Sequence, residues 1–288
     1  MKVLIVAGEL ADRAAEIREG WLSQAPADEV TVFRVPETAA DAVGTLGLTD
    51  VSREPASEIL DALGTGRTVV VSDRNLHDGG ASLIWAARER WGGLEAARRA
   101  IAGTRFLCED AAALRGLRGA GALRAASIGD EAALAEDRRA GEFADVIEKE
   151  IARLDLVNGR PMRWSLEPYS GAGGGVGFAL LALGGSAQHV RDGCAEITGL
   201  AGHVAASDLV VVVLNTLGVE ELTASLATAV ADAAIENAVP VVVVVREDHT
   251  SRRQRANLGI VGTYSYGDEL NTVKARAQRI ARTWSVSG

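Results

Sequence analysis

Short apolar runs recur along the chain and share one character: they are rich in β-branched residues, and apolar and polar positions do not alternate within them. Such runs are typical of strands buried on both faces of a sheet. Segments with helical periodicity separate them; in the first, Ala14, Ile17 and Trp21 fall at helical spacing. Strands are predicted at 3–7, 30–35, 68–71, 209–214 and 239–245, and helices at 11–24, 81–91, 131–154, 219–237 and 272–284.

The order of these elements predicts the fold class. Strands that alternate with helices form a parallel sheet flanked by helices, so the chain is predicted to be an α/β protein. Residues 109–127 are rich in Ala, Gly and Arg and fit neither pattern. Residues 158–175 hold two prolines and most of the local glycine, which indicates a long connection, either a domain crossing or a loop beside a cleft.

Composition narrows the classes of partner. The formal net charge is −9 and aromatic residues make up 4% of the chain, so neither a nucleic-acid footprint nor binding to an anionic membrane is expected. Cys108 and Cys194 have no motif spacing, and no apolar run reaches membrane-spanning length. These features predict a reduced, cytoplasmic protein with a small-molecule ligand, and a homodimer is compatible with them.

The segment Ser170–Gly185, SGAGGGVGFALLALGG, is the strongest local signal. Glycine lets another group approach the backbone closely, and a glycine-rich turn that opens a helix aims N–H groups at an anion. However, Val176 and Phe178 break G-x-G-x-x-G, and no lysine completes a phosphate-binding loop. The alternative is a loop that enters a buried helix, with small residues that permit tight packing.

This segment resembles the PGAGAAGGLGFALLALGA signature of the bacterial two-domain glycerate kinases. The similarity continues in SDRNLHDGG (residues 72–80), which is similar to GLGGSATNDGG, and in the strands SDLVVVVL and VPVVVVV. The resemblance implies ATP and Mg²⁺ as cofactors and glycerate, or a similar small hydroxy acid, as substrate. It also implies a Rossmann-like core at 1–70 and 186–288, and a second α/β part at 71–185, truncated because residues 46–67 replace a longer segment.

The resemblance also indicates which chemical groups are missing. Phosphoryl transfer needs cations at the phosphates and carboxylates for the metal. The lysine of the family's first loop is absent, and Glu9 stands near its place. The DVDNP segment becomes Glu109-Asp110 followed by three alanines, and the acid of TGEG aligns with Leu214. The segments that form the fold therefore resemble the family more closely than the positions of its catalytic residues do.

Two hypotheses follow from these residues. In the first, the chain is a kinase in which Asp78 serves the metal or the hydroxyl and Arg74 or Arg246 holds the substrate anion. In the second, which the residues favour, it is a non-catalytic paralogue that binds a metabolite or a partner. No ligand set for a resident metal is predicted. The candidate cofactor-binding glycines are Gly79, Gly80, Gly171, Gly173, Gly174, Gly175 and Gly177.

Overall fold

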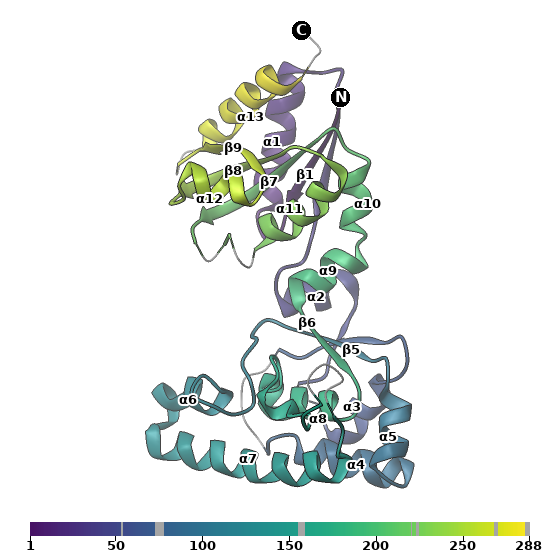
Figure 1. The fold of residues 1–288 in the computed structure, drawn as a ribbon. Coiled ribbons are helices and arrows are strands. Elements are labelled where there is room, and N and C mark those ends of the chain that lie inside the picture. The colour runs from purple at the N-terminus through teal and green to yellow at the C-terminus, as the bar shows by residue number, and fades with distance from the viewer. Residues whose placement is uncertain are drawn as a thin grey trace. The chain divides into compact units, whose positions relative to one another are not determined.

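The chain divides into two compact units (Figure 1). A computed structural model describes residues 1–52, 54–72, 78–154, 159–219, 221–222, 225–267 and 270–285, and for 270–272 the backbone alone. Unit 1 consists of Met1–Glu37 and Arg191–Gly288, and unit 2 of Thr38–Val190. The sequence placed these boundaries after residues 70 and 185. The strands of residues 49–50 and 68–70 pair within unit 2, which is why that unit begins earlier.

Unit 1 is a five-stranded parallel sheet in the order β2-β1-β7-β8-β9. The chain leaves β1 toward β2 on one side and later returns to place β7 on the other, so β1 and β7 flank the topological switch point. Its elements are β1 (Lys2–Ala7), α1 (Ala11–Gln24), β2 (Glu29–Arg34), α9 (Val190–Ile197, which begins at the last residue of unit 2), α10 (Leu200–Ala205), β7 (Leu209–Leu217), α11 (Leu226–Asn237), β8 (Val241–Asp248), α12 (Arg252–Asn257), β9 (Ile260–Ser265) and α13 (Leu270–Trp284).

Both faces of this sheet are buried, as its unbroken apolar strands predict. On one face, Ile5 and Val211 pack in a single core with Trp21 of α1 and Ile280 of α13. Neighbouring strand residues point to opposite faces, so the fully buried Val6 lies on the other face, where α11 contacts β7 and β8.

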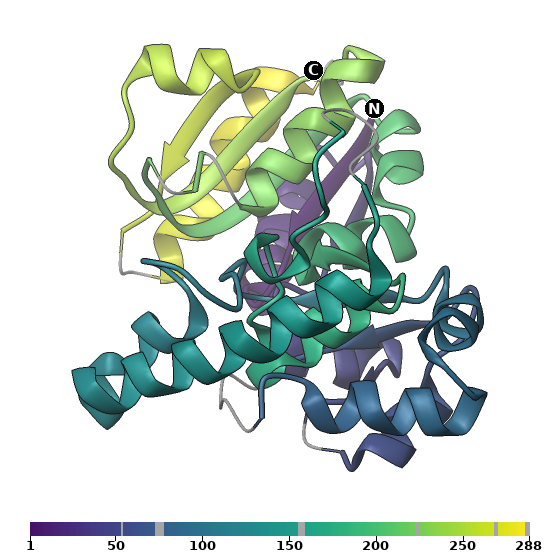
Figure 2. The same cartoon turned by 60° about the horizontal axis from the view of Figure 1, so that its bottom comes forward.

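Unit 2 is a four-stranded parallel sheet in the order β3-β4-β5-β6. The long helix α7, teal in Figures 1 and 2, contacts α6 and α8. Its elements are α2 (Ala39–Leu46), β3 (Thr49–Asp50), α3 (Ala56–Ala62), β4 (Thr68–Val70), α4 (Ala81–Trp91), α5 (Leu94–Ile101), β5 (Arg105–Cys108), α6 (Ala120–Ile128), α7 (Asp130–Ile151), the 3₁₀ turns η1 (Trp164–Leu166) and η2 (Ala172–Gly175), α8 (Val176–Ala182) and β6 (Ser186–His189).

The parallel α/β class is confirmed, and the predicted helices at 11–24 and 81–91 have the observed bounds. The helix predicted at 219–237 begins later, at Leu226, because the hydroxyl of Ser225 accepts a hydrogen bond from the N–H of Ala227 and forms part of a capping box. No helix among the described residues is long and apolar enough to cross a membrane.

Candidate functional site

The carboxyl ends of parallel strands are the usual place for ligands in α/β sheets, and in unit 2 this edge carries several acids. Asp50, the last residue of β3, accepts hydrogen bonds from the N–H and hydroxyl of Ser52 at 3.0 and 2.7 Å. Its other oxygen accepts one from the hydroxyl of Ser72, just after β4. Burial alone raises the pKa of Asp50, but these hydrogen bonds outweigh it and hold the pKa below its ordinary value.

Asp78 lies at the start of α4 and acts as a cap. One carboxylate oxygen accepts a hydrogen bond from the N–H of Gly80 at 2.9 Å, and the other accepts one from Ser82 at 2.7 Å. The first N–H groups of a helix have no partner within the helix, so a carboxylate here satisfies them and interacts favourably with the helix dipole. The retained aspartate therefore has a structural role that requires no metal.

The two acids after β5 are likewise engaged with backbone groups. Glu109 accepts a hydrogen bond at 2.6 Å from the N–H of Ala39, the first residue of α2, and Asp110 accepts one from Ala112 at 2.9 Å. Cys108 ends β5, and its thiol is buried. Burial, followed by the charges of Asp110 and Asp50, raises the pKa of this thiol well above its ordinary value, so it stays protonated.

The glycine-rich segment packs backbone against backbone. Gly175 has φ +104°, and a Cβ built on it would lie 2.2 Å from the carbonyl carbon of Gly79. A Cβ on Gly80, φ +87°, would lie 2.3 Å from the carbonyl oxygen of Gly175. A contact below 3.0 Å with backbone cannot be relieved by a rotamer change, so both positions require glycine for the packing alone.

Two of the other predicted glycines, Gly171 and Gly177, also lie close to backbone, and Gly173 lies close to a side chain. A Cβ would lie 2.6 Å from the Ala113 carbonyl oxygen at Gly171, 2.6 Å from Cγ1 of Val71 at Gly173, and 2.1 Å from the Tyr169 carbonyl oxygen at Gly177. Gly174 and Gly79 have left-handed backbones, with φ +65° and +66°. The structure thus brings the DGG turn and the glycine-rich segment together, as contacting surfaces of one core.

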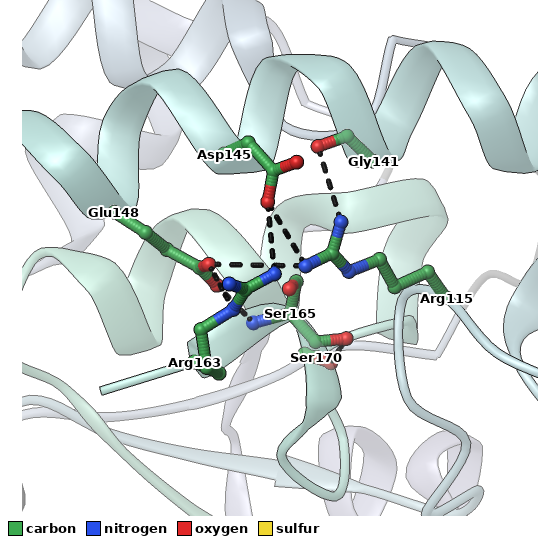
Figure 3. Close-up of polar contacts among 7 residues, drawn as sticks. All are labelled: Arg115, Gly141, Asp145, Glu148, Arg163, Ser165 and Ser170. Carbon is green, nitrogen blue, oxygen red and sulfur yellow. Dashed lines mark hydrogen bonds and ion pairs between the residues drawn. The ribbon is translucent and has the colours of Figure 1, made fainter. Parts of the chain in front are cut away.

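A network of charged and polar groups anchors the residues just before the glycine-rich segment (Figure 3). The sequence did not predict this network. Glu148 of α7 is buried and accepts a hydrogen bond at 2.9 Å from the backbone N–H of Ser165. It also forms an ion pair with Arg163, whose Nε atom lies 2.9 Å from Oε2 of Glu148. Asp145 accepts from both Arg115 and Arg163, at 3.0 and 2.9 Å. No motif spacing marks these residues, because they come from three separate segments.

The buried hydroxyl of Ser170 completes the anchoring of the glycine-rich segment. It accepts a hydrogen bond from the N–H of Leu114 at 2.7 Å and donates to the carbonyl oxygen of Glu167 at 2.8 Å. The residue that begins the glycine-rich signature is therefore tied to the loop after β5 and to its own turn, which fixes where the glycines begin.

In unit 1, two acids lie near predicted anion contacts. Glu37 lies against Gly8 after β1, since a Cβ on Gly8 would be 1.7 Å from its Oε2 atom. Arg246, predicted to hold a substrate anion, donates to Glu247 at 3.1 Å, and Glu247 also pairs with His249 at 3.3 Å. The hydrogen bond from Arg246, and then that from His249, lower the pKa of Glu247. The predicted Arg74 lies outside the described residues.

Comparison with known proteins supplies the family. The model of the glycerate kinase family matches residues 56–285, which is most of the chain. The chain belongs to the glycerate kinase family. The crystal structure of "putative glycerate kinase 2" from Salmonella typhimurium LT2 has the same fold, with a TM-score of 0.63, 16% identity, and 98% of each chain covered.

Two curated proteins of similar sequence come from mycobacteria, an "uncharacterized protein" of Mycobacterium bovis and one of Mycobacterium tuberculosis. Each is 29% identical over 209 residues, or 68% of this chain. The chain spans about half the length of these relatives, since 49% of each is covered.

Glycerate kinase family membership implies ATP-dependent phosphotransfer, so the described residues must be tested against a magnesium nucleotide. At phosphoryl-transfer sites, Mg²⁺ is usually held by one or two carboxylates together with phosphate oxygens and water. Among the described residues, no group of three or more His, Cys, Asp or Glu side chains is placed to hold a metal ion. Asp78 and Glu109 instead accept from helix-start N–H groups. In the described part of unit 2, these acids therefore bind backbone N–H groups and belong to no cluster of three or more possible metal ligands.

Proposed function

We propose that this glycerate kinase family protein has lost phosphotransfer and acts by binding a small metabolite anion or a protein partner. The proposal rests on the contacts that the retained DGG turn and glycine-rich segment make. Asp78 caps α4 with both carboxylate oxygens, and Gly80 and Gly175 pack against each other's backbone. These roles account for the DGG turn and the glycine-rich segment without a nucleotide.

The missing cations support the same proposal. Phosphoryl transfer depends almost entirely on positioning and on neutralising charge, and removing one charged or hydrogen-bonding partner typically costs about 3–4 kcal/mol of transition-state stabilisation. The family's first-loop lysine is absent, and Arg246, the candidate anion contact, is paired with Glu247. We expect the remaining rate of phosphate transfer to be too low for metabolism.

The second candidate is the family's own activity, ATP-dependent phosphorylation of glycerate or a similar hydroxy acid. The match over residues 56–285 favours it, as does the exposed position of Asp78, because a capping carboxylate keeps lone pairs that a metal or hydroxyl would use. In this candidate Asp78 serves the metal or hydroxyl, and Arg74 or Arg246 the substrate anion.

A coupled ADP-release assay with ATP, Mg²⁺ and D-glycerate separates the two candidates. We expect no glycerate-dependent ADP release above the rate with ATP alone, and no change in Asp78→Asn. A glycerate-dependent rate that Asp78→Asn abolishes, but that the exposed control Asp61→Asn keeps, would establish the kinase instead.

Binding is tested separately by thermal shift. A ligand that binds only the folded state raises the melting temperature, and the stabilisation grows with the ligand concentration relative to Kd. Stabilisation by D-glycerate or ATP without turnover supports a metabolite-binding protein, whereas no stabilisation by either directs the search to a protein partner. Turnover at a rate ordinary for a metabolic kinase would refute the proposal.

A further inference from the structure

The lining of a large cavity in unit 2 includes neither the DGG turn nor the glycines at 171–177. Its volume is about 750 Å³, within the usual range for small-molecule sites, and its lining includes Arg98, Arg153, Met162, Trp164, Tyr169 and Leu181. Arg98 belongs to α5, Leu181 to α8, and Trp164 to the 3₁₀ turn η1. The cavity thus combines two cations with an apolar wall, which is the composition of a site for an organic anion.

Arg98 is held in place before any ligand arrives. Its guanidinium lies 5.2 Å from the ring centroid of Trp164, which is buried, and Nη1 donates to the carbonyl oxygen of Ala182. A guanidinium has five N–H donors in one plane. Among the described residues, Arg98 uses one of them, in the hydrogen bond to Ala182. The remaining donors are fixed in orientation, so little side-chain entropy is lost when they bind a carboxylate.

Arg153 adds a second positive charge to the same cavity. Its Nη2 atom lies 3.3–3.4 Å from the two carboxylate oxygens of Glu95, and its side chain is 55% exposed. Burial, and then repulsion from Arg153, lower the pKa of the Arg98 guanidinium. Both arginines line the cavity, so an anion bound there would be attracted by two positive charges. Glu167 also lines the cavity but is exposed to solvent.

The apolar part of the lining suits an apolar body. Met162 and Leu181 are half-buried there, and Leu154, also in the lining, is 58% exposed. Tyr169 contributes a ring and has φ +68°, a left-handed backbone that costs a non-glycine residue about 1–3 kcal/mol. Such strain persists where the surroundings impose it, and it concentrates at ligand sites.

We infer that this cavity binds a small organic anion, with its carboxylate between Arg98 and Arg153 and a planar apolar body against Met162 and Leu181. This inference does not rest on the proposed function, because it uses neither the DGG turn nor the glycines at 171–177.

Isothermal titration of the full chain tests the inference with three probes. Benzoate carries both the charge and the ring, acetate the charge alone, and benzyl alcohol the ring alone. We expect measurable binding of benzoate at millimolar concentrations, and at least about tenfold weaker binding of the other two. Failure of benzoate to bind, or equal binding of acetate, would overturn the inference.

Two variants locate the site. Arg98→Gln and Arg153→Ala should each weaken benzoate binding about tenfold, the factor that one lost charged contact of about 1.4 kcal/mol gives. Arg90→Gln is the matched control, because Arg90 also lies 5.2 Å from a tryptophan ring, that of Trp91, but outside the cavity. Arg153 is exposed, so its variant should fold even if Arg98→Gln does not. Unchanged affinity in Arg153→Ala and in folded Arg98→Gln would contradict the placement.

Discussion

Gly175→Ala is the substitution that best separates packing from anion binding in the glycine-rich segment. The new methyl group would meet three backbone atoms of the DGG turn: the carbonyl carbon and Cα of Gly79 at 2.2 and 2.5 Å, and the nitrogen of Gly80 at 2.6 Å. Backbone at the start of α4 cannot rotate away as a side chain does, so the turn must shift.

The cost has two parts. A backbone at φ +104° costs a residue with a Cβ about 1–2 kcal/mol, and overpacking a dense core typically costs about 1–3 kcal/mol more. The free energy of unfolding should therefore fall by about 2–5 kcal/mol, out of the roughly 5–15 kcal/mol available to a domain. In a domain of this size, such a loss lowers the melting temperature by roughly 10 °C.

Urea unfolding followed by circular dichroism measures this loss, with Gly44→Ala as the matched control. Gly44 lies within α2, and a Cβ there meets nothing within 4 Å, so alanine should stabilise the helix by up to about 1 kcal/mol. If Gly175→Ala loses less than about 1 kcal/mol, packing does not require this glycine. The anion-cradle interpretation would then be the better explanation of its presence.

Three further predictions concern carboxylates. Asp78→Ala should cost about 1 kcal/mol of unfolding free energy, because two helix-start N–H groups lose their acceptor; no loss would contradict the capping role. Glu148→Gln should cost about 1–3 kcal/mol, whereas Glu150→Gln, which loses an exposed pair with Arg88, should cost less than about 1 kcal/mol; equal losses would refute the importance of burial. Burial raises the pKa of Asp28, but hydrogen bonds from the N-terminal ammonium group and Trp21 outweigh it and lower the pKa. Its contribution to stability is therefore present above the unfolded value of about 3.9 and is lost as pH falls through the folded value. Acid unfolding of Asp28→Asn should show a shallower pH dependence, and an unchanged one would contradict this assignment.

The predictable part of the fold is the part with a strong local pattern. The valine-rich runs of β7 and β8 are buried on both faces, and a parallel sheet is the setting in which such runs are common. Strands β5 and β6 were not predicted. Each has four residues, which is too short to show a clear pattern, and β6 reads Ser-Ala-Gln-His, which lacks the apolar character of a buried strand.

The site was harder to predict because its roles depend on partners far away in sequence. Asp78 and the glycines were identified as candidates from the family resemblance, but their neighbours were not. Glu109 meets the N–H of Ala39, 70 positions earlier, and Ser170 meets that of Leu114, 56 positions earlier. Arg98 and Arg153, which line the cavity, belong to no recognisable sequence motif, so the sequence did not mark them as candidates.

By itself, the sequence determined the α/β class, the family and the positions where glycine is required, because burial of β-branched runs and the absence of a side chain are properties of the chain itself. The tertiary structure decided what approaches each glycine and which donor each carboxylate meets. Those contacts form between segments that only folding brings together. The same glycine accommodates either an anion or a neighbouring backbone, and its neighbour in space distinguishes the two.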